Sequence, residues 1–143
     1  MSRGDFNFTA RAAADLSADV GRVMQITGST GGLPNVIRAT SAALGGAKEQ
    51  LIGILDMNAN STAVGEEVNI ALPGAVIENA LAGDTITPGT NLELTTDATG
   101  RLVPAVAGQQ YCALYLSHRT AAVGNRITVK VWHGFTDAAG GSI

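Results

Sequence analysis

The chain uses one pattern twice, first as Leu51-Ile-Gly-Ile-Leu-Asp-Met, a polar loop and Ala63-Val-Gly-Glu-Glu-Val-Asn-Ile-Ala-Leu72. The second copy is Tyr111-Cys-Ala-Leu-Tyr-Leu-Ser, a polar loop and Ala122-Val-Gly-Asn-Arg-Ile-Thr-Val-Lys-Val131. The copies align at an offset of 60 residues before the loop and 59 residues after it, so they differ by one loop residue. Each copy predicts a hairpin, made of an apolar strand, a loop that ends at glycine and a strand of alternating character.

Alternation with a period of two places the apolar side chains of the second strand of each copy on one face. These side chains are Val68, Ile70 and Leu72 in the first copy, and Ile127, Val129 and Val131 in the second. The first strand of each copy is apolar throughout, as expected when both faces of a strand are covered. In a chain of this size, that pattern indicates a closed or sandwiched sheet, or cover by a neighbouring subunit. The alternative is that two ordinary hairpins look alike by chance.

Short strands separated by turn signals fill most of the remaining chain, and they predict an all-β barrel or sandwich. Turns are indicated at Pro73-Gly74, at Pro88-Gly89 and at Asp97-Ala-Thr-Gly100. Besides the two hairpins, strands are expected at residues 20–26, 36–40, 75–79, 92–96 and 101–105.

The chain divides into an N-terminal arm (residues 1–19), a single β domain (residues 20–135) and a Gly-rich C-terminal tail (residues 136–143). A length of 143 residues fits one domain with a sizeable core. Within the arm, the Ala-rich stretch from Ala10 to Leu16 suggests a helix that is too short to stand alone. The arm carries Phe6 and Phe8, which are costly to leave in water. We therefore expect the arm to pack against a partner or over its own domain.

The composition favours a body that is partly covered by another molecule. Hydrophobic residues make up 45% of the chain, aromatic residues 4% and charged residues only 15%. So low a charged fraction is unusual for a free-standing monomer and indicates that part of the surface is buried against a partner. The net charge is −3 and no basic run occurs. Nucleic-acid binding by phosphate neutralisation is therefore not expected.

Cysteine usage and hydropathy point to a protein made in a reducing compartment that needs no membrane. The single cysteine, Cys112, lies in an apolar strand and has no second cysteine to pair with. The N-terminus carries no hydrophobic signal core, and no apolar run approaches the length of a membrane span.

No residue pattern predicts a catalytic, cofactor or metal site. The stretch Gly28-Ser-Thr-Gly-Gly lacks the Gly-Lys-Ser/Thr end of a phosphate loop and is interpreted as a turn. His118 and His133 have no cysteine or histidine at a metal-ligand spacing, so each is expected at the surface or at an interface. Cys112 has no basic neighbour and is expected to be an inert core thiol. Acidic residues are scattered, which leaves a carboxylate pair possible only if folding brings two together.

Aromatic residues are the candidate interface residues. If Ile127, Val129 and Val131 face inward, Trp132 faces outward, where tryptophan is a common interface anchor. The alternative is that the arm or the tail covers Trp132 within one subunit. Tyr111 and Tyr115 share one face of their strand and are expected between subunits. The full candidate set is Phe6, Phe8, Tyr111, Tyr115 and Trp132.

The order of these motifs resembles that of the small capsid decoration, or cement, proteins of tailed bacteriophages. Each motif alone is turn chemistry plus alternation, so their order and spacing carry the resemblance, which covers Asp15 to Val131. The motifs are Asp15-Leu-Ser-Ala, Ile52-Gly-Ile, Val64-Gly-Glu-Glu-Val, Gly74, Gly83-Asp, Pro88-Gly-Thr, Thr96-Asp-Ala-Thr-Gly-Arg-Leu-Val-Pro, Ala122-Val-Gly124 and Ile127-Thr-Val-Lys-Val. The arm before Asp15 and the tail match no motif of that family.

The resemblance implies a small β-barrel or β-tulip fold and a homotrimer on the outer surface of an icosahedral head, made in the host cytoplasm. It implies binding to the major capsid protein after expansion and no catalytic residues. We therefore expect a non-enzymatic virion protein that stabilises the head. A small β-barrel binding module for a glycan or peptide, displayed on the virion, is the first alternative. A trimeric hydrolase with its site between subunits is the second.

Overall fold

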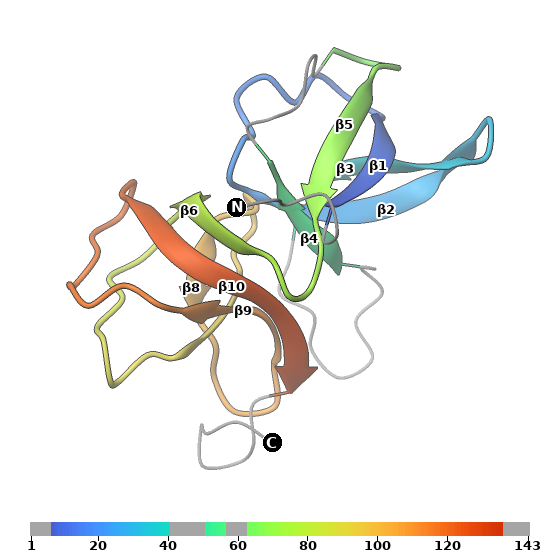
Figure 1. The fold of residues 1–143 in the computed structure, drawn as a ribbon. Coiled ribbons are helices and arrows are strands. Elements are labelled where there is room, and N and C mark those ends of the chain that lie inside the picture. Colours follow the sequence, from blue (N-terminus) through green and yellow to red (C-terminus); the bar gives the residue numbers. More distant parts are fainter. Residues whose placement is uncertain (1–6, 41–50, 57–62, 136–143) are drawn as a thin grey trace.

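The computed structural model describes residues 7–40, 51–56 and 63–135, and within these ranges the chain forms strands and no helix (Figure 1). The strands are β1 (Asn7–Ala12), β2 (Val23–Thr30), β3 (Leu33–Arg38), β4 (Leu51–Leu55), β5 (Glu67–Ala71), β6 (Val76–Leu81), β7 (Glu93–Thr96), β8 (Leu102–Pro104), β9 (Gln110–Tyr115) and β10 (Arg126–Phe135). The predictions for the polar loop after β4, for the 41–50 linker and for the 136–143 tail fall on residues outside these ranges.

Strands β1 to β5 close into a barrel in the order β1-β3-β2-β4-β5, and β6 to β10 form a second sheet in the order β6-β10-β9-β7-β8. In the barrel only β1 and β3 pair in parallel, whereas the second sheet is antiparallel. The prediction of an all-β fold with a small barrel is therefore confirmed. Figure 1 places the barrel and the second sheet side by side.

The two sheets have the same topology, strand for strand. In each, the fourth strand lies between the second and the fifth, the third pairs with the second, and the first pairs with the fifth. The barrel is closed where Ala13 N donates to Val36 O at 2.9 Å, and the second sheet has the matching bond from Gly83 N to Leu102 O at 2.8 Å. We call β1–β5 the first unit and β6–β10 the second unit.

The strand registers of the two units match as well. In the first hairpin Leu55 lies opposite Ile70, and in the second Tyr115 lies opposite Val129, as the sequence alignment predicts. Other matching pairs are Val23↔Ile54 with Glu93↔Leu114, Met24↔Arg38 with Leu94↔Pro104, and Arg11↔Glu67 with Leu81↔Arg126. The repeat therefore extends from the predicted hairpin to all five strands of each unit.

The side chains inside the two units occupy matching positions. The core cluster of the first unit is Ala10, Ala12, Leu16, Met24, Val36, Leu55, Val68 and Ile70. Their counterparts are Ala80, Ala82, Ile86, Leu94, Leu102, Tyr115, Ile127 and Val129, and every one belongs to the other buried cluster. Hydrophobic character is kept at each position while size changes, which is how cores tolerate substitution when total volume is preserved.

The two units are joined by a shared core and by backbone hydrogen bonds. Val23, Ala39, Ile54 and Ala71 point outward from the barrel and pack into the cluster of the second unit, and we call these four residues the junction face. Val23 N donates to Gly100 O at 2.7 Å, and Leu81 N donates to Gly21 O at 3.0 Å. The β7–β8 turn and strand β6 therefore cover this side of the barrel.

A compact hydrogen-bonded turn holds the junction. Asp97 accepts bonds from the backbone N and hydroxyl of Thr99, both at 2.8 Å, and from Arg101 Nε at 3.0 Å. Arg22 of the first unit donates from Nη1 to Thr99 O of this turn at 2.6 Å. Fixing Thr99 and Gly100 thus fixes the second unit against the first.

The arm prediction differs from the structure. Asn7–Ala12 forms β1, a strand of the barrel paired with β3 and β5, so the first barrel contains part of the predicted arm. The helix suggested for Ala10 to Leu16 is wrong, because Ala10 and Ala12 alternate into the barrel core and Leu16 joins them after a bend. Tertiary burial here overrides the helix propensity of alanine.

Asp97→Asn should reduce the acid sensitivity of folding. Partial burial alone would raise the pKa of Asp97, but hydrogen bonds from Thr99 and Arg101 and the charge of Arg101 outweigh it and lower the pKa from 3.8. A carboxyl group whose pKa is lower in the folded than in the unfolded state stabilises the fold at pH values above the unfolded-state pKa. This stabilisation is lost as the pH falls from the unfolded-state pKa through the folded-state pKa. Urea unfolding between pH 7 and pH 3 should show a lower free energy for Asp97→Asn at pH 7 and a smaller further loss on acidification. An unchanged pH slope, or the same change in an Asp84→Asn control, would contradict this role.

Gly53→Ala should destabilise the barrel by about 3 kcal/mol, since overpacking a close backbone contact forces the strands apart. A Cβ at Gly53 would overlap the carbonyl oxygen of Ala71 and lie 2.9 Å from Ile70 Cγ2. The counterpart position in the second unit holds Ala113, which provides a matched control. Ala113→Gly should cost only about 1 kcal/mol. Thermal and denaturant unfolding would check both values, and equal costs would contradict the account.

Candidate functional site

Trp132 is the exposed aromatic side chain of the second unit. It is 44% exposed, while Ile127, Val129 and Val131 are buried, so the predicted alternation along β10 is confirmed. Lys130 lies on the same side, with its ammonium 4.9 Å from the centre of the indole ring. A cation over an indole face is attracted by the ring quadrupole, which helps to hold both side chains in place at the surface.

The two tyrosines lie inside the second unit. Tyr111 and Tyr115 are 4% and 6% exposed, and the Tyr115 hydroxyl donates to the carbonyl oxygen of Arg119. Tyr111 packs so closely on Gly134 that a Cβ there would lie 2.6 Å from Tyr111 Cζ. Both side chains therefore contribute to the core of their own subunit and leave little surface for contact with another one.

The phenylalanines of the arm separate into two cases. Phe8 lies on β1, is half-buried and packs against the core cluster of the first unit. This corresponds to the alternative that the arm covers its own domain. Phe6 lies outside the residues that the structure describes.

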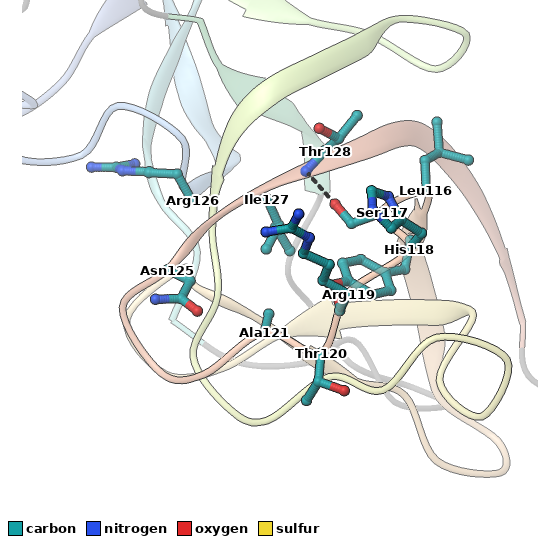
Figure 2. A pocket seen from close by; sticks show the side chains of 11 residues that line it. Leu116, Ser117, His118, Arg119, Thr120, Ala121, Asn125, Arg126, Ile127 and Thr128 are labelled. Carbon is teal, nitrogen blue, oxygen red and sulfur yellow. Dashed lines mark hydrogen bonds between the residues drawn. The ribbon is translucent and has the colours of Figure 1, made fainter.

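A hollow of about 470 Å³ opens beside the β9–β10 loop (Figure 2). Its lining comes from residues 115–121 and 125–128, with Thr128 N donating to Ser117 Oγ at 3.2 Å. The lining includes the cationic side chain of Arg119 and the imidazole of His118, and it contains no carboxylate. The guanidinium of Arg126 points away from the hollow (Figure 2) and donates to Val20 O at 2.6 Å and to Asn79 O at 3.1 Å. The chemistry of the hollow suits an anionic or hydroxyl-rich group and does not provide the carboxylate pair of a glycosidase.

Two other groups could carry chemistry, and their surroundings argue against it. Burial raises the pKa of the Cys112 thiol to about 12, so it stays protonated and unreactive at neutral pH. Burial lowers the pKa of His133, and its Nε2 has no hydrogen-bond partner within the described ranges. Among the described residues, no three His, Cys, Asp or Glu side chains gather as metal ligands.

None of the described segments is a helix long and apolar enough to cross a bilayer.

Sequence reasoning missed the exposed aliphatic residues. Leu92, Val106 and Leu116 of the second unit are 52%, 61% and 49% exposed. Val64 and Val123 are exposed at matching positions of the two hairpin loops, just before the glycines that end them. The repeated Ala-Val-Gly was visible in the sequence as a signal for the loop valines. The leucines carried no such signal, because they lie at the ends of strands that read as buried.

Comparison with known proteins finds no family model, no curated protein and no solved structure that matches this chain.

Proposed function

We propose that this protein is a structural virion protein that binds the outer surface of an icosahedral phage head as a homotrimer and stabilises it against internal pressure. The order of motifs from Asp15 to Val131, which resembles that of phage decoration proteins, is the main support. Its expected partners are the major capsid protein and further copies of itself. No enzymatic step, cofactor, nucleic acid or membrane enters the proposal.

The single structural observation that carries the proposal is the exposed apolar surface on a body built only from strands. Leu92, Leu116 and Trp132 are each between 44% and 52% exposed. Exposed large apolar residues on a surface of low charge are typical of sites that bind other proteins. Among interface residues, tryptophan is the one most often found to dominate the binding energy.

The architecture suits a clamp that must transmit load. The barrel is closed, which removes free strand edges, and the second unit shares a continuous core with it. Such a body resists deformation when neighbouring capsid subunits are pulled apart. Because each trimer would contact the shell at several points, modest individual contacts would add up through effective concentration.

Trp132→Ala should weaken binding to heads while leaving the protein folded. Loss of a buried interface tryptophan costs about 2 kcal/mol or more, so the capsid dissociation constant should rise by roughly thirtyfold. Binding would be measured by co-sedimentation of purified protein with expanded heads of the phage that encodes it. The melting temperature should stay within about 2 °C of the parent protein, since an exposed residue contributes little to folding.

Val123→Ala is the matched control, because Val123 is also an exposed apolar residue but lies on a hairpin loop away from Trp132. It should bind heads like the parent protein. The full chain must be used, since removing residues 1–14 would delete β1 from the barrel. Failure of the parent protein to bind expanded heads would contradict the proposed function, and equal binding by Trp132→Ala would exclude Trp132 as an anchor.

The hollow beside the β9–β10 loop favours a second candidate, a binding module for a glycan or peptide. Arg119 and His118 offer hydrogen-bond donors toward acidic or hydroxyl groups. A ligand that binds only the folded state raises the melting temperature in proportion to its occupancy. Thermal shifts with acidic glycans and peptides, in the absence of heads, would separate this candidate from capsid binding.

A further inference from the structure

The repeated unit has one face that is covered by the other unit in the first copy and, within the described residues, by no further unit in the second. The junction face of the first unit is closed by β6 and the β7–β8 turn, and Val23, Ala39 and Ile54 on it are fully buried. Within the described residues no third unit covers the equivalent side of the second unit. A comparison with the first unit therefore indicates what would cover this side.

Backbone bonds fix which residues correspond. Leu55 N donates to Arg22 O, and Tyr115 N donates to Leu92 O, so Leu92 takes the place of Arg22. The same comparison matches Glu93 with Val23, Ala105 with Ala39, Leu114 with Ile54 and Leu116 with Asp56. Lys130 pairs with Leu114 as Ala71 pairs with Ile54, so Lys130 takes the place of Ala71. We call Leu92, Glu93, Ala105, Leu114, Leu116 and Lys130 the open face.

The open face differs from the junction face in exposure and in the placement of its apolar residues. Leu92 and Leu116 replace the polar Arg22 and Asp56, whereas the charged Glu93 and Lys130 replace Val23 and Ala71. Leu92 and Leu116 are 52% and 49% exposed, and Leu114 is half-buried where its counterpart Ile54 is fully buried. Leucines at these positions add apolar area that nothing within the described residues covers fully. Exposed apolar area of this kind is unfavourable in water unless a partner covers it.

We propose that the open face binds the first unit of a second copy of this chain, head to tail. The occupant follows from the repeat: β6 and the β7–β8 turn cover the junction face, and their counterparts in the first unit are β1 and the β2–β3 hairpin. That hairpin is available, because residues 27–32 are exposed. Figure 1 shows it projecting from the barrel on the side away from the second sheet.

The two surfaces offer one pair of opposite charges, Glu93 and Arg11, while Lys130 on the other side of Leu114 adds a positive charge to the open face. On the open face Glu93 is 5% exposed, and its Oε2 has no hydrogen-bond partner within the described ranges. On the occupant, Arg11 is the counterpart of Leu81, which bonds to the barrel at the junction, and its guanidinium lies beside Gly31 at the hairpin turn. A buried unpaired carboxylate is costly, and an incoming guanidinium would satisfy it.

A head-to-tail contact uses two different surfaces of each copy, so it forms a closed ring or an open chain of copies. Three copies joined in this way would present six units around one axis. That number rests on the trimer of the proposed function, whereas the contact itself does not depend on capsid binding. The experiment below therefore uses purified protein without heads.

The test disrupts the open face and the β2–β3 hairpin in separate variants and then mixes the two variant proteins. Leu116→Glu alters the open face, Ser29→Glu alters the hairpin, and Val123→Glu places the same charge on a loop outside both. Native mass spectrometry and sedimentation velocity should find the parent protein and Val123→Glu assembled. Each of the other two variants should associate at least about tenfold more weakly, because each places a charge inside the buried contact between the two copies.

An equimolar mixture of Leu116→Glu and Ser29→Glu distinguishes a head-to-tail contact from a symmetric one. Each variant keeps the surface that the other lacks, so one intact contact remains and mixed dimers should appear. A monomeric parent protein, unchanged assembly of Leu116→Glu, or the absence of mixed dimers would overturn the proposal. Circular dichroism would confirm folding, and Leu92→Glu would replace Leu116→Glu if that variant unfolds.

The failure of the proposed function can be distinguished from the failure of this contact. If the protein assembles head to tail but does not bind heads, the contact stands and the capsid role is contradicted. If the protein binds heads as a monomer, the capsid role stands and the contact is contradicted.

Discussion

The burial of the outward side chains of the barrel against the second unit is the contact on which the rest of the structure depends. Val23 and Ile54 point away from the barrel interior, and both are fully buried because β6 and the β7–β8 turn lie over them. Burying a side chain of this size contributes about 1.5–3 kcal/mol. The contact explains why β4 is apolar on both faces, since one face fills the barrel and the other fills the junction. Asp97 holds the turn that delivers Gly100 to this contact.

The same constraint acts on the second unit with a different outcome. Its strand β9 is also apolar on both faces, with Tyr115 inside and Leu114 outside, yet no third unit within the described residues covers the outside. A duplicated unit thus leaves one face without its usual cover. The proposed second copy would supply that cover, and this proposal would connect the internal repeat and the low charge of the chain to self-association.

The sequence predicted what depends on local alternation and missed what depends on long-range pairing. The duplicated hairpin and the outward position of Trp132 were predictable, because a period of two fixes the face of each side chain. The repeat of the remaining strands was hidden, since β1 and β6 share little more than small apolar residues such as Ala10 and Ala80. Tyr115 was misplaced because its interior position corresponds to Leu55, and an aromatic residue in place of leucine resembles an interface residue. The burial of Glu93 could not be predicted, because alternation fixes the face of a side chain but not what packs on that face.

An experimental structure of the assembled protein tests the central claim most directly, namely that one contact is used both within and between copies. The second unit of one copy would be superposed on the first unit, and the position of the neighbouring copy would be compared with the intramolecular junction. The account predicts that the neighbour's β2–β3 hairpin falls where the β7–β8 turn lies, with Leu116 buried beneath it. An assembly in which the open face remains in solvent, or meets its own copy across a two-fold axis, would contradict the account.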